Sequence, residues 1–280
     1  MRQNISRKEL ENAALMIRRD IVEMIYNAKS GHLGGSLSIA DIMAVIYWAV
    51  MDVDPENPDD AERDRFVLSK GHTAPALYSA LAERGFFPRE NLFKQYRRID
   101  PTLQGHPDMK KTPGVDMSSG SLGLGLSAAV GMALGAKRKK RSFNVYCIVG
   151  DGETNEGGIW EAAASAAFYK LDNLYTFVDL NGMQNDGFTR DVMDMGDLEA
   201  KWRAFGWQVF DVDGHDVMDI YSKIEQSMTI KNKPTVFICR TVKGKGVSFM
   251  ENSIRFHGGQ PTREEYLQAC RELGLDTETV

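Results

Sequence analysis

Cysteine is scarce in this sequence, with three residues among 280. The count is odd, and Cys147, Cys239 and Cys270 lie far apart, the first two inside apolar runs. This pattern excludes a small secreted protein held together by disulfides. We therefore expect three reduced thiols, in the core or at the surface.

Long hydrophobic runs are also missing. No stretch approaches the roughly 18 to 20 uncharged apolar residues that a membrane span needs. The first residues move directly into a charged amphipathic pattern, without the apolar segment and cleavage site of a signal peptide. We expect a cytoplasmic protein that has no membrane partner.

A strong excess of one charge is absent as well. The 34 basic and 39 acidic residues leave a formal net charge of −5. The one basic run, Lys137 to Arg141, comes just before an apolar strand-like segment, which is typical of a helix C-terminus. The charge pattern gives no support for a nucleic-acid partner.

Apolar strand-like segments alternate with helical ones along the chain. The clearest unit is a strand at Phe143–Val149, a helix at Gly158–Tyr169 and a strand at Leu174–Leu180. This alternation predicts an α/β fold, with a mostly parallel sheet that has helices on both faces. Other expected strands are Arg65–Ser69, Trp207–Val212 and Pro234–Val242, and other expected helices are Ser6–Ala28, Ile39–Met51, Ala74–Arg84, Ser127–Lys137, Leu198–Phe205 and Asp216–Met228.

The remaining segments are interpreted as loops of the same domain. A glycine-rich segment at Ser30–Ser38 interrupts the helical pattern, and Leu92–Met117 is mostly irregular, as the wall of a ligand site often is. We expect a single domain over residues 1–280. The segment after Arg263 has a helical pattern, and Thr277–Val280 is expected to be a mobile tail.

Two polar motifs follow the strands of the central unit. Gly150-Asp151-Gly152 comes directly after one strand, and Asn181-Gly182-Met183 directly after the next. Parallel strands bring these ends to the same edge of the sheet, and carboxylate and amide oxygens suit Mg²⁺ or Ca²⁺. The pair therefore predicts a metal-diphosphate clamp, and an ordinary acidic turn is the alternative.

Four of the five histidines have a glycine neighbour in a loop: His32, His72, His106 and His257. Glycine lets the backbone approach a ligand closely, and histidine can bind phosphate or transfer protons near neutral pH. Their spacing does not fit a zinc site. The fifth, His215, precedes a helix and is interpreted as a surface or core residue.

Seven segments in the same order resemble the thiamine-diphosphate-binding half of a transketolase, and they cover nearly the whole chain. They are Ser30-Gly31-His32-Leu33-Gly34-Gly35, Leu68-Ser69-Lys70-Gly71-His72, Gly105-His106-Pro107, Gly120-Ser121-Leu122-Gly123, Gly150-Asp151-Gly152-Glu153, Asn181-Gly182-Met183 and Lys243-Gly244-Lys245-Gly246.

The resemblance implies a role for each matching residue. The metal ligands would be Asp151, Asn181 and the Met183 carbonyl, with Mg²⁺ as the ion and Ca²⁺ or Mn²⁺ as substitutes. Catalysis would use His32, His106 and His257 at the reacting end of the sugar, with Glu156 at the partner domain. The cofactor-binding residues would be His72, Gly120, Leu122, Gly152, Glu153, Asn181 and His257.

The resemblance also implies that a second chain is needed. Transketolases in one chain are more than twice this length, and the glutamate that activates the cofactor's aminopyrimidine lies in the portion that this sequence lacks. The sequence therefore resembles the N-terminal subunit of a split transketolase. Its separately encoded partner would supply the pyrimidine-binding and C-terminal domains, in an assembly of two copies of each, and the substrates would be sugar phosphates.

Other interpretations remain. The segment Gly123 to Ala128 fits a dinucleotide-binding pattern, but no strand precedes it. A non-catalytic regulatory subunit is another alternative, and 1-deoxyxylulose-5-phosphate synthase shares the cofactor in a longer single chain. Asn185 stands where the family usually has an apolar residue near the cofactor rings, which leaves room for an unusual donor such as a branched or sulfonated ketose.

Overall fold

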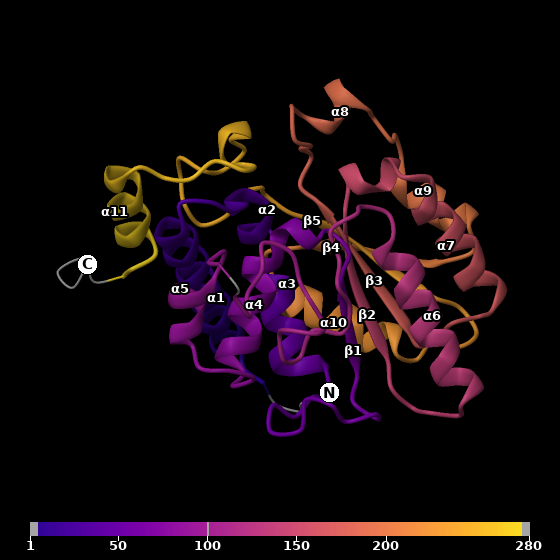
Figure 1. Ribbon diagram of the computed structural model, residues 1–280. Coiled ribbons are helices and arrows are strands. Elements are labelled where there is room, and N and C mark those ends of the chain that lie inside the picture. The colour runs from indigo at the N-terminus through magenta and orange to yellow at the C-terminus, as the bar shows by residue number, and fades with distance from the viewer. Residues whose placement is uncertain (1–4, 100, 276–280) are drawn as a thin grey trace.

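The computed structural model describes residues 5–99 and 101–275. Its centre is one sheet of five parallel strands in the order β1-β2-β3-β5-β4, as Figure 1 shows. The strands are β1 (Arg65–Leu68), β2 (Val145–Gly150), β3 (Leu174–Leu180), β4 (Gln208–Asp213) and β5 (Thr235–Arg240). The predicted parallel sheet is confirmed, and all carboxyl ends of its strands lie along one edge.

Helices pack on both faces of this sheet, as the sequence predicts (Figure 1). One face is covered by α1 (Arg7–Ala28), α3 (Ala40–Val45), α4 (Ala74–Glu83) and α10 (Val217–Ser227). The other face is covered by α6 (Gly125–Arg138), α7 (Gly157–Phe168) and α9 (Leu198–Ala204). The shorter α2 (Leu33–Leu37), α5 (Glu90–Gln95) and α8 (Thr189–Val192), and the terminal α11 (Arg263–Glu272), complete the described α-helices.

Alternation along the strands explains why both faces are covered. In β2, Tyr146 and Ile148 join the core beneath α1 and α4, while Cys147 and Val149 join the core beneath α6 and α7. These four side chains are fully buried. Because neighbouring residues of a strand point to opposite faces, an apolar run of this kind is stable only between two layers of helices.

Polar side chains fix where the first and last helices begin. The Ser6 hydroxyl accepts a hydrogen bond from the Glu9 amide, and the Glu9 carboxylate accepts one from the Ser6 amide. Thr262 and Glu265 form the same reciprocal pair at the start of α11. Such capping boxes satisfy amides that the first helical turn leaves without partners.

The structure differs from the predictions at one loop and in one helix. The segment Ser30–Ser38, predicted as a loop, contains the short helix α2. Gly34 and Gly35 are needed there because the helix packs so closely against its neighbours that a side chain would not fit. A Cβ atom on Gly34 would lie 2.9 Å from Cγ of Lys243, and one on Gly35 would lie 2.9 Å from Cγ2 of Thr73. The helix predicted over Ile39–Met51 is present, but its last turn, Ile46–Val50, is a π-helix.

Other expectations can be checked directly. The thiols of Cys147, Cys239 and Cys270 are free and buried. Residues 112–124 contain no strand, so the glycine pattern at Gly123 lacks the strand that a dinucleotide site requires. None of the helices within the described ranges is both long and apolar enough to cross a membrane. The predicted tail, Thr277–Val280, lies outside the described residues.

Candidate active site

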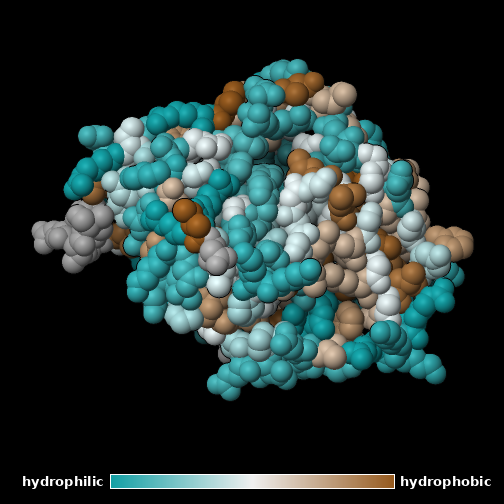
Figure 2. All heavy atoms as spheres, in the orientation of Figure 1, coloured by the Kyte–Doolittle hydropathy of each residue, from teal (hydrophilic) through white to brown (hydrophobic). Residues whose placement is uncertain are grey.

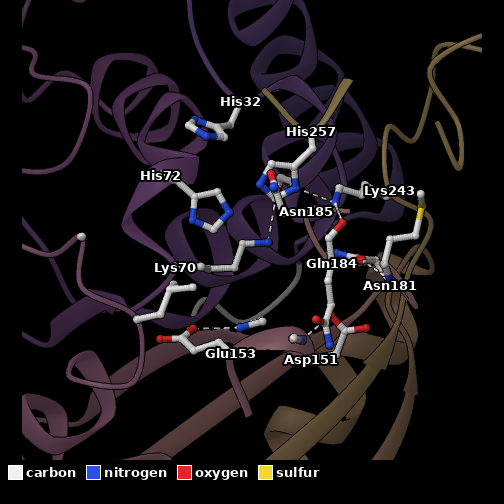
Figure 3. Close-up of a pocket in the computed structure, with 16 residues that line it drawn as sticks. His32, Lys70, His72, Asp151, Glu153, Asn181, Gln184, Asn185, Lys243 and His257 are labelled. Atoms are coloured by element: carbon white, nitrogen blue, oxygen red, sulfur yellow. Dashed lines mark hydrogen bonds between the residues drawn. The ribbon is translucent and has the colours of Figure 1, made fainter. Parts of the chain in front are cut away.

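A cavity of about 370 Å³ opens at the carboxyl edge of the sheet. Figure 3 shows its labelled residues, with His32, His72 and His257 grouped on one side and Asp151 and Asn181 on another. Its lining is His32, Gly35, Lys70, His72, Gly120, Leu122, Gly150, Asp151, Gly152, Glu153, Asn181, Met183, Gln184, Asn185, Lys243 and His257. The structure therefore brings together most of the residues that the sequence singled out.

Asp151 sits directly after β2, where strand pairing aligns Gly150 with Asp179 of β3. Its carboxylate accepts hydrogen bonds from the Gly152 amide at 2.8 Å and from the Gly182 amide at 2.7 Å. Burial, and then the neighbouring Asp179 carboxylate, raise the pKa of Asp151 to about 7. Such a carboxylate gains from a nearby cation, which would offset its desolvation.

Asn181 follows β3 and is held by hydrogen bonds at both ends of its amide. Its Oδ1 accepts from the Met183 amide at 3.1 Å, and its Nδ2 donates to Oδ2 of Asp179 at 2.8 Å. Within residues 5–99 and 101–275, no three His, Cys, Asp or Glu side chains form a metal-binding group. An ion here would thus depend on Asp151, the Asn181 amide, a main-chain carbonyl and oxygens of a bound anion.

Lys70, which lines the cavity, forms a buried ion pair with Asp179. Nζ of Lys70 lies 2.5 Å from Oδ2 of Asp179, and the two side chains are 3% and 0% exposed. Burial alone would raise the pKa of Asp179, but the Lys70 ammonium and the Thr241 and Ser38 hydroxyls hold it below its usual value. Lys70 Nζ also donates to the Gly35 carbonyl at 3.0 Å.

Three imidazoles lie next to one another at this cavity. The ring centroid of His32 is 5.0 Å from that of His72 and 5.5 Å from that of His257. Burial and neighbouring positive charges lower the pKa of all three, to about 4 for His32 and about 3 for His257. The rings are therefore neutral at pH 7 and have one donor and one acceptor nitrogen each.

One buried nitrogen of this group has no hydrogen-bond partner among the described residues. Nδ1 of His32 is buried and makes no hydrogen bond. Gly35 and Gly152 line the same cavity, so main chain without a side chain faces it at both positions. An orphaned polar atom beside bare backbone fits a site that is completed by a polar ligand.

Lys243 brings a second ammonium group to the cavity. Its Nζ lies 2.7 Å from Nδ1 of His257 and donates to the Gln184 carbonyl at 3.2 Å. Burial, and then the Lys70 charge, lower the pKa of Lys243 to about 8. The Lys243 ammonium and the N–H groups of the imidazoles can bind an anionic ligand, while Asp151 and Glu153 also line the cavity.

The remaining predicted residues lie in or beside this cavity. Gly120 and Leu122 line it, while His106 lies behind Gly120, where a Cβ atom would come within 3.3 Å of the imidazole Cδ2. His106 itself lines a separate, more open pocket with Asp108 and Ser118. The structure thus does not group His106 with the other three imidazoles.

The two glutamates differ in their surroundings. Glu153 is 3% exposed, and its carboxylate accepts from the Ser69 hydroxyl and from the amides of Gly123 and Gly150. Both of its oxygens are occupied, so it shapes the loop that carries Gly120 and Leu122. Glu156 is exposed beside Gly123, where a partner could reach it.

Sequence reasoning missed four residues of the site: Lys70, Asp179, Gln184 and Lys243. Both lysines lie inside motifs that the sequence shares with the family, but no role was given to either. The available signal was Asp179, a carboxylate inside an otherwise apolar strand, because a buried charge of this kind requires a buried cation. Asn185, which was noted as unusual, does line the cavity.

Comparisons with known proteins agree with this site. A family model described as "Transketolase, thiamine diphosphate binding domain" matches residues 8–280. The chain is 46% identical over 265 residues to the 6-deoxy-6-sulfo-D-fructose transketolase subunit of a Clostridium species, a match that covers 95% of this chain and 96% of that protein. It is 42% identical over 256 residues to an apulose-4-phosphate transketolase subunit of Phocaeicola vulgatus, covering 91% of this chain and 90% of that one.

Longer relatives match through one portion of their length. Human transketolase is 40% identical over 267 residues, which are 94% of this chain but 42% of the human protein. The crystal structure of transketolase from Campylobacter jejuni superposes with a TM-score of 0.91 and 32% identity, over 98% of this chain and 44% of that one. With its family model, its fold and relatives of its own length all in agreement, this chain belongs to the transketolase family, as a thiamine-diphosphate-binding subunit.

Proposed function

We propose that this chain holds thiamine diphosphate with Mg²⁺ and, together with a separate partner subunit, transfers a two-carbon ketol unit from a ketose donor to an aldose acceptor. The 280 residues would form one diphosphate-binding domain. The observation that carries the proposal is the shared cavity, in which a buried carboxylate at a strand end faces neutral histidines and two lysines.

The metal end of the cofactor would be held at the strand ends. Asp151, the Asn181 amide oxygen and the Met183 carbonyl are hard oxygen donors, and Mg²⁺ usually completes its shell with phosphate oxygens and water. Ca²⁺ or Mn²⁺ should substitute, because they accept the same donors. Binding of the ion would stabilise the ionised form of Asp151, whose pKa is raised in its absence.

The diphosphate would be held by groups on both sides of the metal. Lys243, His72 and His257 supply cationic and N–H donors, and Gly152 allows close approach of the backbone. A side chain at position 152 would collide with Gln184, because its Cβ atom would lie 2.9 Å from Cγ of that residue. Gly120 and Leu122 would contact the aminopyrimidine, and Glu153 would hold their loop in place.

Proton transfer would be the task of the histidines. When bound, thiamine diphosphate supplies the electron sink that lets a carbon–carbon bond beside a ketose carbonyl break. Neutral rings at His32 and His257 can donate to or accept from sugar hydroxyls, and such groups typically contribute about 10² to 10⁴ in rate. His106 would join them from the adjacent pocket once a substrate bridges the two.

The partner would complete the site from outside. Leu122 lines the cavity and is 38% exposed, and two further apolar side chains, Leu124 and Met193, are 55% and 60% exposed. Brown atoms also gather over the α8 segment in Figure 2. These residues, with Glu156, suit a surface that a second subunit covers, and the relatives of this chain's length are named as subunits. We propose an assembly of two copies of each subunit.

The donor is proposed to be a sulfonated or branched ketose. Two relatives of similar length are named for 6-deoxy-6-sulfo-D-fructose and for apulose 4-phosphate. The polar Asn185 at the cavity agrees with a departure from the ordinary pentose phosphate reaction. A cytoplasmic location is supported by the three free thiols, since a reducing compartment preserves them.

Cofactor binding can be tested separately from activity. Thiamine diphosphate with Mg²⁺ should raise the melting temperature of the chain mixed with its partner, and Asp151→Ala should abolish the rise. Asp211→Ala, which removes an exposed carboxylate from β4, is the matched control and should keep it. An unchanged rise in Asp151→Ala would refute the metal assignment.

Activity requires the assembled complex. The complex should be offered 6-deoxy-6-sulfo-D-fructose, apulose 4-phosphate and xylulose 5-phosphate as donors, with an aldose phosphate as acceptor. Ketol transfer from one of the first two at the highest kcat/KM supports the proposed donor class. Preference for xylulose 5-phosphate would indicate an ordinary transketolase, and condensation of pyruvate would favour the synthase alternative.

A further inference from the structure

His215 belongs to a largely buried network of polar groups outside the cavity. Its Nδ1 lies 2.7 Å from Oδ2 of Asp41 in α3, and that carboxylate also pairs with the Arg18 guanidinium of α1 at 3.0 and 2.5 Å. Arg18 and Asp41 are 8% and 6% exposed. His215 comes just before α10, so the three groups link α1, α3 and α10.

Both ends of this polar network, His215 and Arg18, bond to the segment that carries Lys243. The Val242 amide donates to Nε2 of His215 at 2.8 Å, and Nε of Arg18 donates to the Lys245 carbonyl at 3.1 Å. The residues before and after the Lys243-Gly244 pair are thus bonded to one polar network. The Gly244 amide donates in addition to the Gly34 carbonyl at 2.9 Å.

The hydrogen bonds also set the tautomer of His215. Because Nε2 accepts from the Val242 amide, it carries no hydrogen, and Nδ1 must carry the ring proton and donate it to Asp41. A carboxylate that accepts from an imidazole orients the ring, as it does beside metal sites. The Arg18 charge keeps Asp41 ionised, since the pKa of Asp41 is lowered despite its burial.

We infer that His215, oriented by Asp41 and Arg18, is a positioning residue that holds the Val242–Lys245 segment and so keeps the Lys243 ammonium against His257 in the cavity. This inference rests on the proposed function, in which Lys243 and His257 face the bound diphosphate. It gives a role in the site to the one histidine that the sequence pattern assigned to the surface or core.

The segment has main-chain supports as well, since the Asn252 amide donates to the Lys243 carbonyl at 2.8 Å, but few side chains hold it. Lys243 Nζ is anchored at 2.7 Å to His257 and at 3.2 Å to the Gln184 carbonyl, but both are partners at the far end of a flexible side chain. The backbone at Val242 is set by His215 alone among side chains that donate to or accept from it in the described part of the chain. A shift of the backbone there would change where the Lys243 side chain can place its ammonium, and placement errors near 1 Å are costly in active sites.

The pKa of His257 depends on the position of Lys243 and can be measured without any ligand. Burial, and then the Lys243 charge, lower the pKa of His257 to about 3. The other charged or titratable groups that face it are His32, Lys70 and His72, whose ring is stacked on that of His257 at 5.5 Å between centroids. If Lys243 moves away, the pKa of His257 should rise by about one unit or more, because a nearby like charge is lost.

The test is an NMR titration of the imidazoles in the full chain without cofactor. His215→Leu should raise the pKa of His257, while His215→Gln should restore it, because the glutamine amide can accept from Val242 and donate to Asp41. His106, in the adjacent pocket, is the internal reference and should titrate unchanged. An unchanged His257 in folded His215→Leu would overturn the inference.

A matched control separates positioning from stability. Asp20→Asn alters another buried carboxylate, which lies in α1 and pairs with Arg89 at 2.5 Å rather than with the Val242–Lys245 segment. It should lower stability and leave His257 unchanged, and an equal shift of His257 in this variant would also overturn the inference. If His215→Leu does not fold, Arg18→Lys provides the same test, since it removes the Nε donor to Lys245 and keeps a charge beside Asp41.

The affinity of the complex for the cofactor tests the proposed function separately from the titration of His257. In the complex, His215→Leu should weaken the affinity for thiamine diphosphate and Mg²⁺ by about tenfold, as for other residues that orient a ligand-binding group. If His257 shifts but the wild-type complex binds no cofactor, the proposed function fails and the positioning network stands. If the cofactor binds and His257 does not shift, the network assignment fails alone.

Discussion

Removal of Lys70 should destabilise the chain through the carboxylate that it leaves behind. In Lys70→Met, Asp179 stays 0% exposed and loses the ammonium that lies 2.5 Å from its Oδ2. Breaking a buried ion pair on one side costs about 3 to 5 kcal/mol. Because Ser38, Thr241 and Asn181 still donate to the carboxylate, we expect a loss near the lower limit, about 3 kcal/mol.

The loss should depend on pH in a definite direction. In the wild type the pKa of Asp179 is depressed, so the stability from its ionisation is present above the unfolded pKa and disappears as pH falls through the folded one. In Lys70→Met the unpaired carboxylate should take up a proton more readily. The variant should therefore approach the wild type as pH falls from about 8 to about 5.

Urea unfolding followed by circular dichroism measures this effect, with the double variant Lys70→Met/Asp179→Asn as the control. The double variant removes the uncompensated charge, so it should regain at least half of the lost free energy and lose the pH dependence. A loss below about 1 kcal/mol in Lys70→Met, the range of exposed ion pairs, would refute the reasoning. So would a double variant that is less stable than Lys70→Met.

Three further predictions concern neighbouring groups. The pKa of His72 is far below its usual value in the folded chain, so the unfolded chain binds more protons below pH ~6.5, and stability should fall as pH is lowered. Replacement by glutamine should reduce this acid slope by up to about 1.4 kcal/mol per pH unit in pH-dependent unfolding, and an unchanged slope would contradict it. Glu153→Gln should lower the free energy of unfolding in urea by about 1 to 3 kcal/mol, because one of the donors from Ser69, Gly123 or Gly150 loses its acceptor. An unchanged free energy would show that the loop does not need the carboxylate. Gly125→Ala should lower the melting temperature by several degrees, because its Cβ atom would lie 2.6 Å from Cα of Ser69, and a stabilised variant would mean that the helix can shift.

The sheet and its edge could be predicted because the signals were local. The apolar runs of β2 and β3 and the polar residues that follow them identify a strand end, and parallel pairing then places Asp151 beside Gly182. The predicted family and fold are confirmed, and relatives of this chain's length are named as transketolase subunits. The roles of the individual site residues stay predictions.

The features that could not be predicted from the sequence depend on contacts between segments that are distant in the chain. A lysine in a loop motif gives no sign of burial, and Lys70 is buried only because Asp179, 109 residues later, receives it. Helix α2 was missed because glycine has low helix propensity, whereas packing against Thr73 and Lys243 compensates in the folded chain. His215 was assigned to the core or surface because the sequence does not show that Val242 and Asp41 meet its two nitrogens.

The strand order also dictates when the sheet can form during synthesis. Strand β4 pairs only with β5, which comes later in the chain and inserts between β3 and β4. Until Arg240 leaves the ribosome, β3 has an open edge and β4 has no partner within the described sheet. Nascent chains that end between residues 213 and 235 should therefore be the most prone to aggregate, because they expose unpaired strand edges.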